Sequence, residues 1–142
     1  CDYSAKSIQT IQETILGVAT DVITSTSLPY DSGKFDLVVS WGVLHYNTFE
    51  DAFKIVNEIK RVLKPNGYFT GTVRSSSDTH LKSNDGVIGL ADLSGGKVKL
   101  YSLDELKSLL KEFTNIQFGY MERTPMGKLD ERICHWIFQA KN

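Results

Sequence analysis

The sequence lacks the features of a membrane anchor, a polycation or a metal-binding array. No apolar run approaches the ~20 residues that a membrane-spanning helix needs, and no basic segment followed by an apolar one opens the chain. The 16 basic residues are balanced by 17 acidic ones, and the net charge of −1 gives no field that would gather nucleic acid. Cys1 and Cys134, the two cysteines, lie at opposite ends of the chain without metal-ligand spacing. We therefore expect a cytoplasmic protein with reduced thiols and no metal, no membrane association and no nucleic-acid partner.

What the sequence does contain is an alternation of helical and strand patterns over 142 residues, the length of one domain. Ser4 is a candidate N-cap for a first helix, because Ile8, Ile11 and Ile15 follow it at helical spacing. A short strand is expected over 16–20. Residues 35–41 are almost continuously apolar, which is typical of a strand covered on both faces of a parallel sheet.

Two capping boxes predict two further helices, one opening at Thr48–Asp51 and one at Ser102–Glu105. The first of these helices has one apolar face and one face of charged residues that we expect to point to water. The charged residues are Lys54, Glu58, Lys60 and Arg61. Pro65-Asn66-Gly67 should end this helix, because proline cannot continue it and Asn-Gly tolerates positive φ. Strands are expected over 68–74, 116–122 and 133–140.

The segment 75–96 is polar and shows no lasting period. A connection of this length inside a compact domain is usually functional or mobile. We interpret 75–96 as a lid-like insertion within a single domain spanning 1–142, in which 78–93 closes over a substrate with His80 at its rim. The alternative is an ordinary mobile loop.

The order of elements predicts an α/β fold. Strands that alternate with helices favour a mainly parallel sheet, and the last two strands supply an antiparallel pair. In open sheets of this kind, ligands bind outside the carboxyl ends of the strands. Asp2, Asp21 and the 40–42 turn are expected at those ends, with His45 just beyond. A carboxylate there can accept two hydrogen bonds from a ribose diol, although each acid could equally cap a helix or satisfy a turn.

Read in order, these segments resemble the class I S-adenosylmethionine-dependent methyltransferases. The matching segments are Asp2-Tyr3-Ser4 for the acidic end of the family's second strand, Asp21 with Leu28-Pro29-Tyr30 for G-D-A…L-P-F, 35–45 for F-D-L-V-x-S…V-L-H, and 58–67 for E-x-x-R-V-L-K-P-G-G. The resemblance covers nearly the whole chain, and it implies a doubly wound, Rossmann-like sheet with S-adenosylmethionine as cofactor.

The resemblance also implies roles for individual residues. Asp2 would bind the ribose hydroxyls and Tyr3 would lie against the adenine or ribose. Asp21 and the Val22 backbone would meet the adenine amino group, and the floor beneath the methionine portion would be lined by Ser40, Trp41 and Gly42. His45 and Tyr46 are the candidate residues for removing a substrate proton, and a packing or cofactor-shell role is the alternative for both. The 63–67 segment is interpreted as structural.

The chain departs from the family in one respect, because the glycine-rich turn after the first strand is missing and no G-x-G occurs. We expect that the N-terminal strands of the family fold are absent, that Val38 and Val39 lie on an unpaired edge, and that this partial domain binds the cofactor poorly and is inactive by itself. The Asn-Pro-Pro-Tyr type of motif seen in amino-methylating nucleic-acid enzymes is absent after the 35–41 strand, and with the balanced charge this favours a small molecule as methyl acceptor. The alternatives are a catalytically silent binding or scaffold protein of the same fold and a nicotinamide-dependent oxidoreductase.

Overall fold

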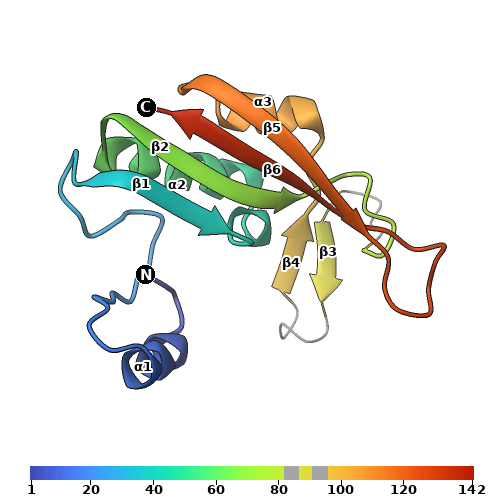
Figure 1. The fold of residues 1–142 in the computed structure, drawn as a ribbon, viewed down its shortest axis with the longest axis horizontal. Helices are drawn as coiled ribbons and strands as arrows, with labels where there is room; N and C mark the ends of the chain where they lie inside the picture. The colour runs from blue at the N-terminus through green and yellow to red at the C-terminus, as the bar shows by residue number, and fades with distance from the viewer. Residues whose placement is uncertain (82–86, 91–95) are drawn as a thin grey trace.

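The computed structural model describes residues 1–81, 87–90 and 96–142. Its helices and strands follow one another along the chain as shown in Figure 1. The helices are α1 (Ala5–Thr14), the short 3-10 helix η1 (Leu44–Tyr46), α2 (Phe49–Val62) and α3 (Leu103–Leu109). The strands are β1 (Phe35–Trp41), β2 (Leu63–Arg74), β3 (Val87–Leu90), β4 (Gly96–Lys99), β5 (Thr114–Arg123) and β6 (Ile133–Lys141). Among the described residues, no helix is long and apolar enough to cross a membrane.

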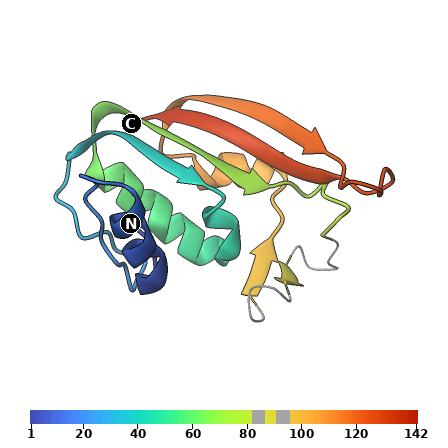
Figure 2. The ribbon, with the colours of Figure 1, turned by 60° about the horizontal axis from the view of Figure 1, so that its bottom comes forward.

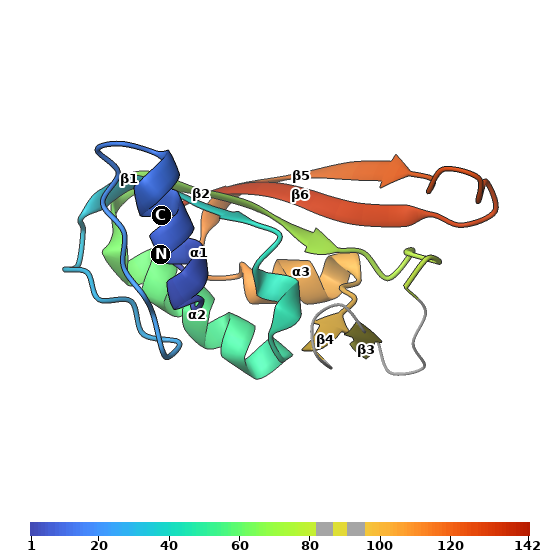
Figure 3. The same ribbon diagram turned by 90° about the horizontal axis from the view of Figure 1, so that it is seen from below.

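The main sheet has four strands in the order β1-β2-β6-β5. β1 and β2 are parallel, whereas β6 runs antiparallel to both β2 and β5. Figures 2 and 3 show α2 and α3 on the same side of this sheet. The α/β class is confirmed, but the expected mainly parallel sheet is not found, because only one of the three strand pairings is parallel. The C-terminal antiparallel pair therefore makes up half of the described sheet.

The predicted strand at 16–20 is wrong. Leu16 is 94% exposed, and none of the described strands pairs with this segment. An isolated parallel bridge joins Asp2 to Val22 instead, through Asp2 N–H donating to the Asp21 carbonyl at 3.2 Å and Ile23 N–H donating to the Asp2 carbonyl at 3.0 Å. A strand becomes stable only beside a hydrogen-bonded neighbour, and this one residue-to-residue bridge is all that the N-terminal segment supplies.

β1 occupies an edge of the sheet, in agreement with the expectation for Val38 and Val39. Val39 is 57% and Leu37 is 53% exposed, whereas Val38 packs against the core. The apolar run at 35–41 is therefore a strand as predicted, but only one of its faces is covered.

The predicted helix starts are confirmed. Ser4 Oγ accepts from Ser7 N–H at 3.1 Å at the start of α1, and Thr48 Oγ1 accepts from Asp51 N–H at 3.1 Å at the start of α2. Ser102 and Glu105 form the reciprocal capping box of α3. α2 ends at Val62, three residues before the proline, and Asn66 adopts a positive φ of 66° in the turn of the chain that follows.

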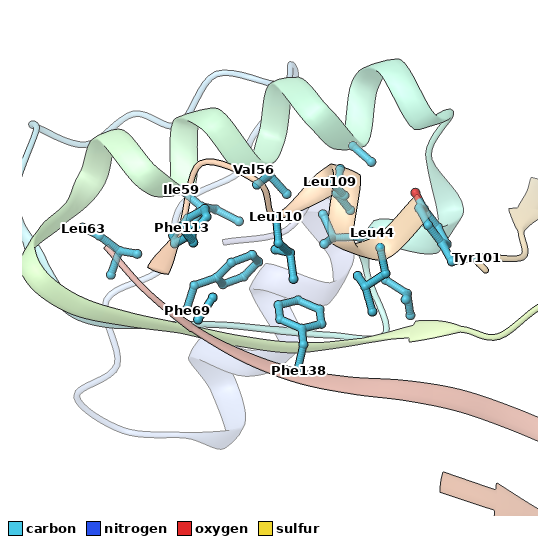
Figure 4. Packing of buried hydrophobic residues seen from close by; sticks show 14 residues of the cluster. Leu44, Val56, Ile59, Leu63, Phe69, Tyr101, Leu109, Leu110, Phe113 and Phe138 are labelled. Carbon is cyan, nitrogen blue, oxygen red and sulfur yellow. The ribbon is translucent and has the colours of Figure 1, made fainter. Parts of the chain in front are cut away.

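The hydrophobic core lies between the sheet and the helices α2 and α3. Phe69 of β2 and Phe138 of β6 meet edge to face at 5.0 Å, and Phe113 lies 5.7 Å from Phe69. Figure 4 shows these rings against Val56 and Ile59 of α2. Each of these side chains is buried, so the sheet and both helices share one core.

The 75–96 segment contains secondary structure that the sequence did not predict. β3 and β4 pair antiparallel, with Val87 opposite Lys99 and Leu90 opposite Gly96. β4 lies beside η1, which brings this hairpin next to the end of β1. The expectation of a lid falls in part on residues 82–86 and 91–95, which lie outside the described residues.

Gly71 provides a test of the sheet register. It pairs with Ser40 on one side and with Phe138 on the other, and a methyl group on its Cα would overlap the Ser40 carbonyl oxygen and lie 2.9 Å from the Phe138 ring. We expect Gly71→Ala to lower the free energy of unfolding by about 1–3 kcal/mol. The matched control is Gly119→Ala, whose added Cβ would lie 3.7 Å from Ile137, an ordinary contact. Urea denaturation of both variants measures the difference, and equal losses would contradict this register.

Candidate functional site

Two cavities meet at the carboxyl ends of β1 and β2. The first, of about 650 Å³, is called the N-terminal cavity here, and the second, of about 480 Å³, is called the cationic cavity. Gly42 and Tyr46 line both of them. The N-terminal cavity is lined by Asp2, Tyr3, Gly42, Val43, Tyr46, Asn47 and Lys97. The cationic cavity is lined by Trp41, Gly42, His45, Tyr46, Thr72, Arg74, His80, Leu81, Val98, Met121, Arg123, Ile133 and His135.

The turn after β1 separates the two cavities. Gly42 has a φ of 71°, a conformation that favours glycine, and its N–H donates to Thr72 Oγ1 at 3.0 Å. Trp41, which pairs with Thr72 across the sheet, is 61% exposed, whereas Ser40 is buried. Of the three residues predicted to form the floor of the site, Gly42 therefore lines both cavities, Trp41 lines the cationic cavity, and Ser40 lies in the sheet beneath.

The N-terminal cavity brings together residues that are far apart in the sequence. Asp2 and Tyr3 line it from the N-terminal segment, and Gly42 lines it from the turn after β1. Oδ1 of Asp2 accepts from Ser4 N–H at 2.8 Å, and this bond fixes the carboxylate at the start of α1. Within the described part of the chain, the second oxygen, Oδ2, has no hydrogen-bond partner. The cavity thus presents one open carboxylate oxygen.

Asp21 and Val22 lie next to Asp2 through the backbone bridge but line a different part of the surface. Neither residue is among those of the N-terminal cavity. Asp21 Oδ2 accepts from the Tyr30 hydroxyl at 3.0 Å, and burial together with this bond raises the pKa of Tyr30. Val22 lines a shallow cavity of about 220 Å³ with residues of the 23–29 loop. The structure therefore brings Asp2, Tyr3 and Gly42 into one cavity and leaves Asp21 and Val22 outside its lining.

The loop that carries Leu28 and Tyr30 is held by α2 through a pair of charged residues. Arg61 donates to the carbonyls of Tyr30 at 2.8 Å and Leu28 at 3.0 Å. Glu58 pairs with Arg61 at 2.8 Å and accepts from Leu28 N–H at 3.0 Å. The hydrogen bond from Arg61 is the main reason that the pKa of Glu58 is lowered to about 2. The expectation that Glu58 and Arg61 simply point to water is therefore wrong, because both act as a clamp on this loop.

His45 is buried in the wall of the cationic cavity. It is 3% exposed, and its ring lies 4.5 Å from the Tyr46 ring and 6.3 Å from the His135 ring. Burial, then the nearby His135 and Arg74, lower the pKa of His45 to about 3. A histidine of such low pKa accepts a proton weakly, which favours the packing role over the role of a general base. Tyr46 is half exposed and lies where the two cavities meet.

An ion pair closes the far side of the cationic cavity. Arg74 Nη2 lies 3.2 Å from Asp78 Oδ2, with the Asp78 side chain fully buried and that of Arg74 11% exposed. Asp78 also accepts from Leu81 N–H at 2.8 Å and from Cys134 N–H at 2.9 Å. His80, which lines the cationic cavity, pairs with Glu131 at 2.5 Å. The start of the 75–96 segment is thus anchored to β2 and β6.

Sequence reasoning missed most of the cationic cavity. Arg74, Arg123 and His135 come from the ends of three strands that are adjacent only in the folded sheet. No motif or spacing links these positions, so the sequence held no signal that they share a site. Among the described residues there is no group of three or more His, Cys, Asp or Glu that could hold a metal ion.

Comparison with known proteins connects this arrangement to one family. A family model described as a methyltransferase domain matches residues 1–70. No curated protein matches the chain. Two solved structures described as SAM-dependent methyltransferases share its fold. The one from Methanosarcina mazei has a TM-score of 0.76 at 20% identity, over 99% of this chain and 79% of that chain. The one from Thermotoga maritima has a TM-score of 0.74 at 14% identity, over 98% and 70%.

A third similar structure is the Burkholderia thailandensis 1,6-didemethyltoxoflavin-N1-methyltransferase, which was solved with 1,6-didemethyltoxoflavin and S-adenosylhomocysteine bound. Its TM-score is 0.65 at 16% identity, and the match covers 97% of this chain and 56% of that chain. The similarities show that the chain shares the α/β fold of these methyltransferases, the class that the motifs at 2–4, 35–45 and 58–67 suggested.

Proposed function

We propose that this protein transfers a methyl group from S-adenosylmethionine to a small molecule, because residues 1–70 match a family model described as a methyltransferase domain and its fold is shared with solved SAM-dependent methyltransferases. The observation that carries the proposal is the N-terminal cavity, in which Asp2, Tyr3 and Gly42 lie together although 38 residues lie between Tyr3 and Gly42 in the sequence.

The residues present fit a nucleoside cofactor. The cavity of about 650 Å³ lies within the usual range for small-molecule and cofactor sites. Oδ1 of Asp2 is engaged by Ser4 N–H, which leaves Oδ2 to accept from ribose hydroxyls. Tyr3 is half exposed and supplies an aromatic surface for the adenine or ribose. We keep Asp21 and Val22 as proposed adenine contacts, because the bridge to Asp2 holds them at the edge of the same segment.

For methyl transfer, the main task of the protein is to position the cofactor and the acceptor. S-adenosylmethionine supplies a methyl group that its own sulfonium already activates. Gly42 and Tyr46 line both cavities and Trp41 lines the cationic cavity beside them. These residues would orient the acceptor and exclude water, and orientation can contribute about 7–11 kcal/mol to catalysis. The balanced net charge of −1 favours a small acceptor over a nucleic acid.

Cofactor binding tests the proposal through Asp2. We expect Asp2→Asn to weaken S-adenosylhomocysteine binding by about tenfold or more, because a charge-assisted hydrogen bond to the ribose is worth about 1.5–3 kcal/mol. The asparagine keeps Oδ1 as acceptor for Ser4 N–H, so the start of α1 is preserved. Because no G-x-G occurs within residues 1–142, we expect these residues by themselves to bind with weak affinity. Equilibrium dialysis at high ligand concentration, or ligand-observed NMR, therefore suits the measurement.

Asp130→Asn is the matched control, because Asp130 is an exposed carboxylate in the β5–β6 loop, outside both cavities. It should leave the affinity unchanged. Absence of S-adenosylhomocysteine binding to a protein that includes a glycine-rich turn would instead support a silent binding or scaffold role.

A further inference from the structure

The cationic cavity collects positive and proton-donating groups that the proposed cofactor site does not use. All three histidines of the chain line it: His45, His80 and His135. Arg74 and Arg123 line it as well, and its described lining contains no aspartate or glutamate. The ionisable groups of basic type therefore face this cavity, and the acids that pair with two of them, Asp78 with Arg74 and Glu131 with His80, stand outside its lining.

Several buried nitrogen atoms in this lining lack hydrogen-bond partners. Four buried side-chain polar atoms of the described residues are unsatisfied, and three belong to the cationic cavity: His45 Nδ1, Arg74 Nε and His135 Nδ1. Buried polar groups in folded proteins nearly always have a partner. Arg74 Nε can only donate, and a neutral histidine can donate from one ring nitrogen. The groups left open in this wall are therefore suited to a ligand that brings acceptor oxygens.

The two arginines in the wall differ in how far the protein balances their charge. Arg74 is paired with the buried Asp78, which supplies its counter-charge. Arg123 forms no ion pair in the described part of the chain. One guanidinium at the cavity thus remains available for an anion, and arginine presents a fork of donors that matches carboxylate and phosphate oxygens.

The position and shape of the cavity suit the methyl acceptor. Its volume of about 480 Å³ holds a small organic molecule. Trp41 and Tyr46 form aromatic walls on the side that adjoins the N-terminal cavity, whereas the two arginines come from the far ends of β2 and β5. A molecule bound here would have its apolar part near Gly42 and its charged group toward the arginines.

We propose that the cationic cavity binds the methyl acceptor through an oxyanion group, a carboxylate or a phosphate, held by Arg123 and Arg74 with the neighbouring histidines. This rests on the proposed function, since it names the substrate class of the same enzyme. The anion anchors and orients the acceptor.

Three probes of similar shape and different charge test the proposal on the full chain. These are benzoate, its neutral isostere benzamide, and phenyl phosphate, each titrated by ligand-observed NMR. We expect benzoate or phenyl phosphate to bind at least about tenfold more tightly than benzamide, as one charge-assisted contact predicts. The stronger of the two anions identifies whether the site prefers a carboxylate or a phosphate. Equal affinity for the anions and benzamide would overturn the proposal.

Two arginine variants place the binding in this cavity. Arg123→Gln removes a charge from the exposed part of the wall without breaking an ion pair, and it should reduce anion affinity about fivefold to tenfold while leaving benzamide unaffected. Arg132→Gln is the matched control, because Arg132 is exposed and lies outside the lining. Identical effects of the two variants would contradict the site. S-adenosylhomocysteine titrated separately at high concentration tells the proposals apart. If it fails to bind while the anion preference persists, the methyltransferase proposal and the role of the bound anion as methyl acceptor are lost, and the anion site itself remains.

Discussion

Asp78→Ala is expected to lower the free energy of unfolding by about 3–5 kcal/mol, the usual loss when one partner of a buried ion pair is removed. The Asp78 side chain is fully buried and lies 3.2 Å from Arg74, whose own side chain is 11% exposed. The alanine would leave the Arg74 guanidinium buried without its counter-charge, and the N–H groups of Leu81 and Cys134 without their acceptor. Urea denaturation followed by far-UV circular dichroism measures the loss.

Two further variants show whether the loss of charge or the loss of hydrogen bonds accounts for most of the destabilisation at Asp78. Asp78→Asn keeps one acceptor oxygen but no charge, and we expect a loss smaller than that of the alanine variant. Asp36→Ala removes a carboxylate whose ion pair with Lys64 is at the surface, since the Asp36 side chain is 81% exposed. This control variant should lower the free energy of unfolding by less than about 1 kcal/mol. Equal losses for Asp36→Ala and Asp78→Ala would contradict the idea that the Asp78 pair anchors the 75–81 segment.

Local patterns predicted the local structure well. The caps at Ser4, Thr48 and Ser102 and the strand at 35–41 follow from side chains within a few residues of each other, and the structure confirms each. The failures concern partners that are distant in the sequence. The 16–20 strand has no neighbour to pair with, and β3 and β4 are four-residue strands whose alternation is too short to detect.

The predictions for the candidate site succeeded and failed for the same reasons as those for the fold. Asp2, Tyr3 and the 40–42 turn were predicted because family motifs mark them, and Asp2, Tyr3 and Gly42 do meet in one cavity. The clamp of Arg61 on the 28–30 loop was missed, although Arg61 lies in the most recognisable motif of the chain. A charged residue on the polar face of a helix gives no sign of which loop will fold against it. Arg74, Arg123 and His135 of the cationic cavity were missed because they meet only through the sheet order β1-β2-β6-β5.

His45 should make the protein sensitive to acid at a pH well above that at which most carboxylates titrate. Its pKa is about 3 in the folded protein against 6.5 when unperturbed, so between these values the unfolded chain binds a proton that the folded one does not. Stability therefore rises with pH from about 3 to 6.5 and falls on acidification through that window. His45 alone should remove about 2 kcal/mol between pH 7 and pH 5, and on the order of 4 kcal/mol by pH 3.

The charged and titratable groups around His45 determine the direction in which its pKa is shifted. Arg74 and His135 both oppose a positive charge on His45, and the pKa of His135 is itself lowered by burial, so both histidines destabilise the fold in acid. The Glu58 carboxyl, with its pKa of about 2, loses its contribution to stability only below pH 4.5, so a stability change between pH 7 and pH 5 reports on the histidines and not on Glu58.

Urea denaturation at pH 7 and at pH 5 measures the change in stability for the unaltered protein and for His45→Asn. We expect the variant to lose about 2 kcal/mol less than the unaltered protein between pH 7 and pH 5. An equal loss in both proteins would mean that His45 is protonated in the folded state, and the wall of the cationic cavity would then carry one positive charge more.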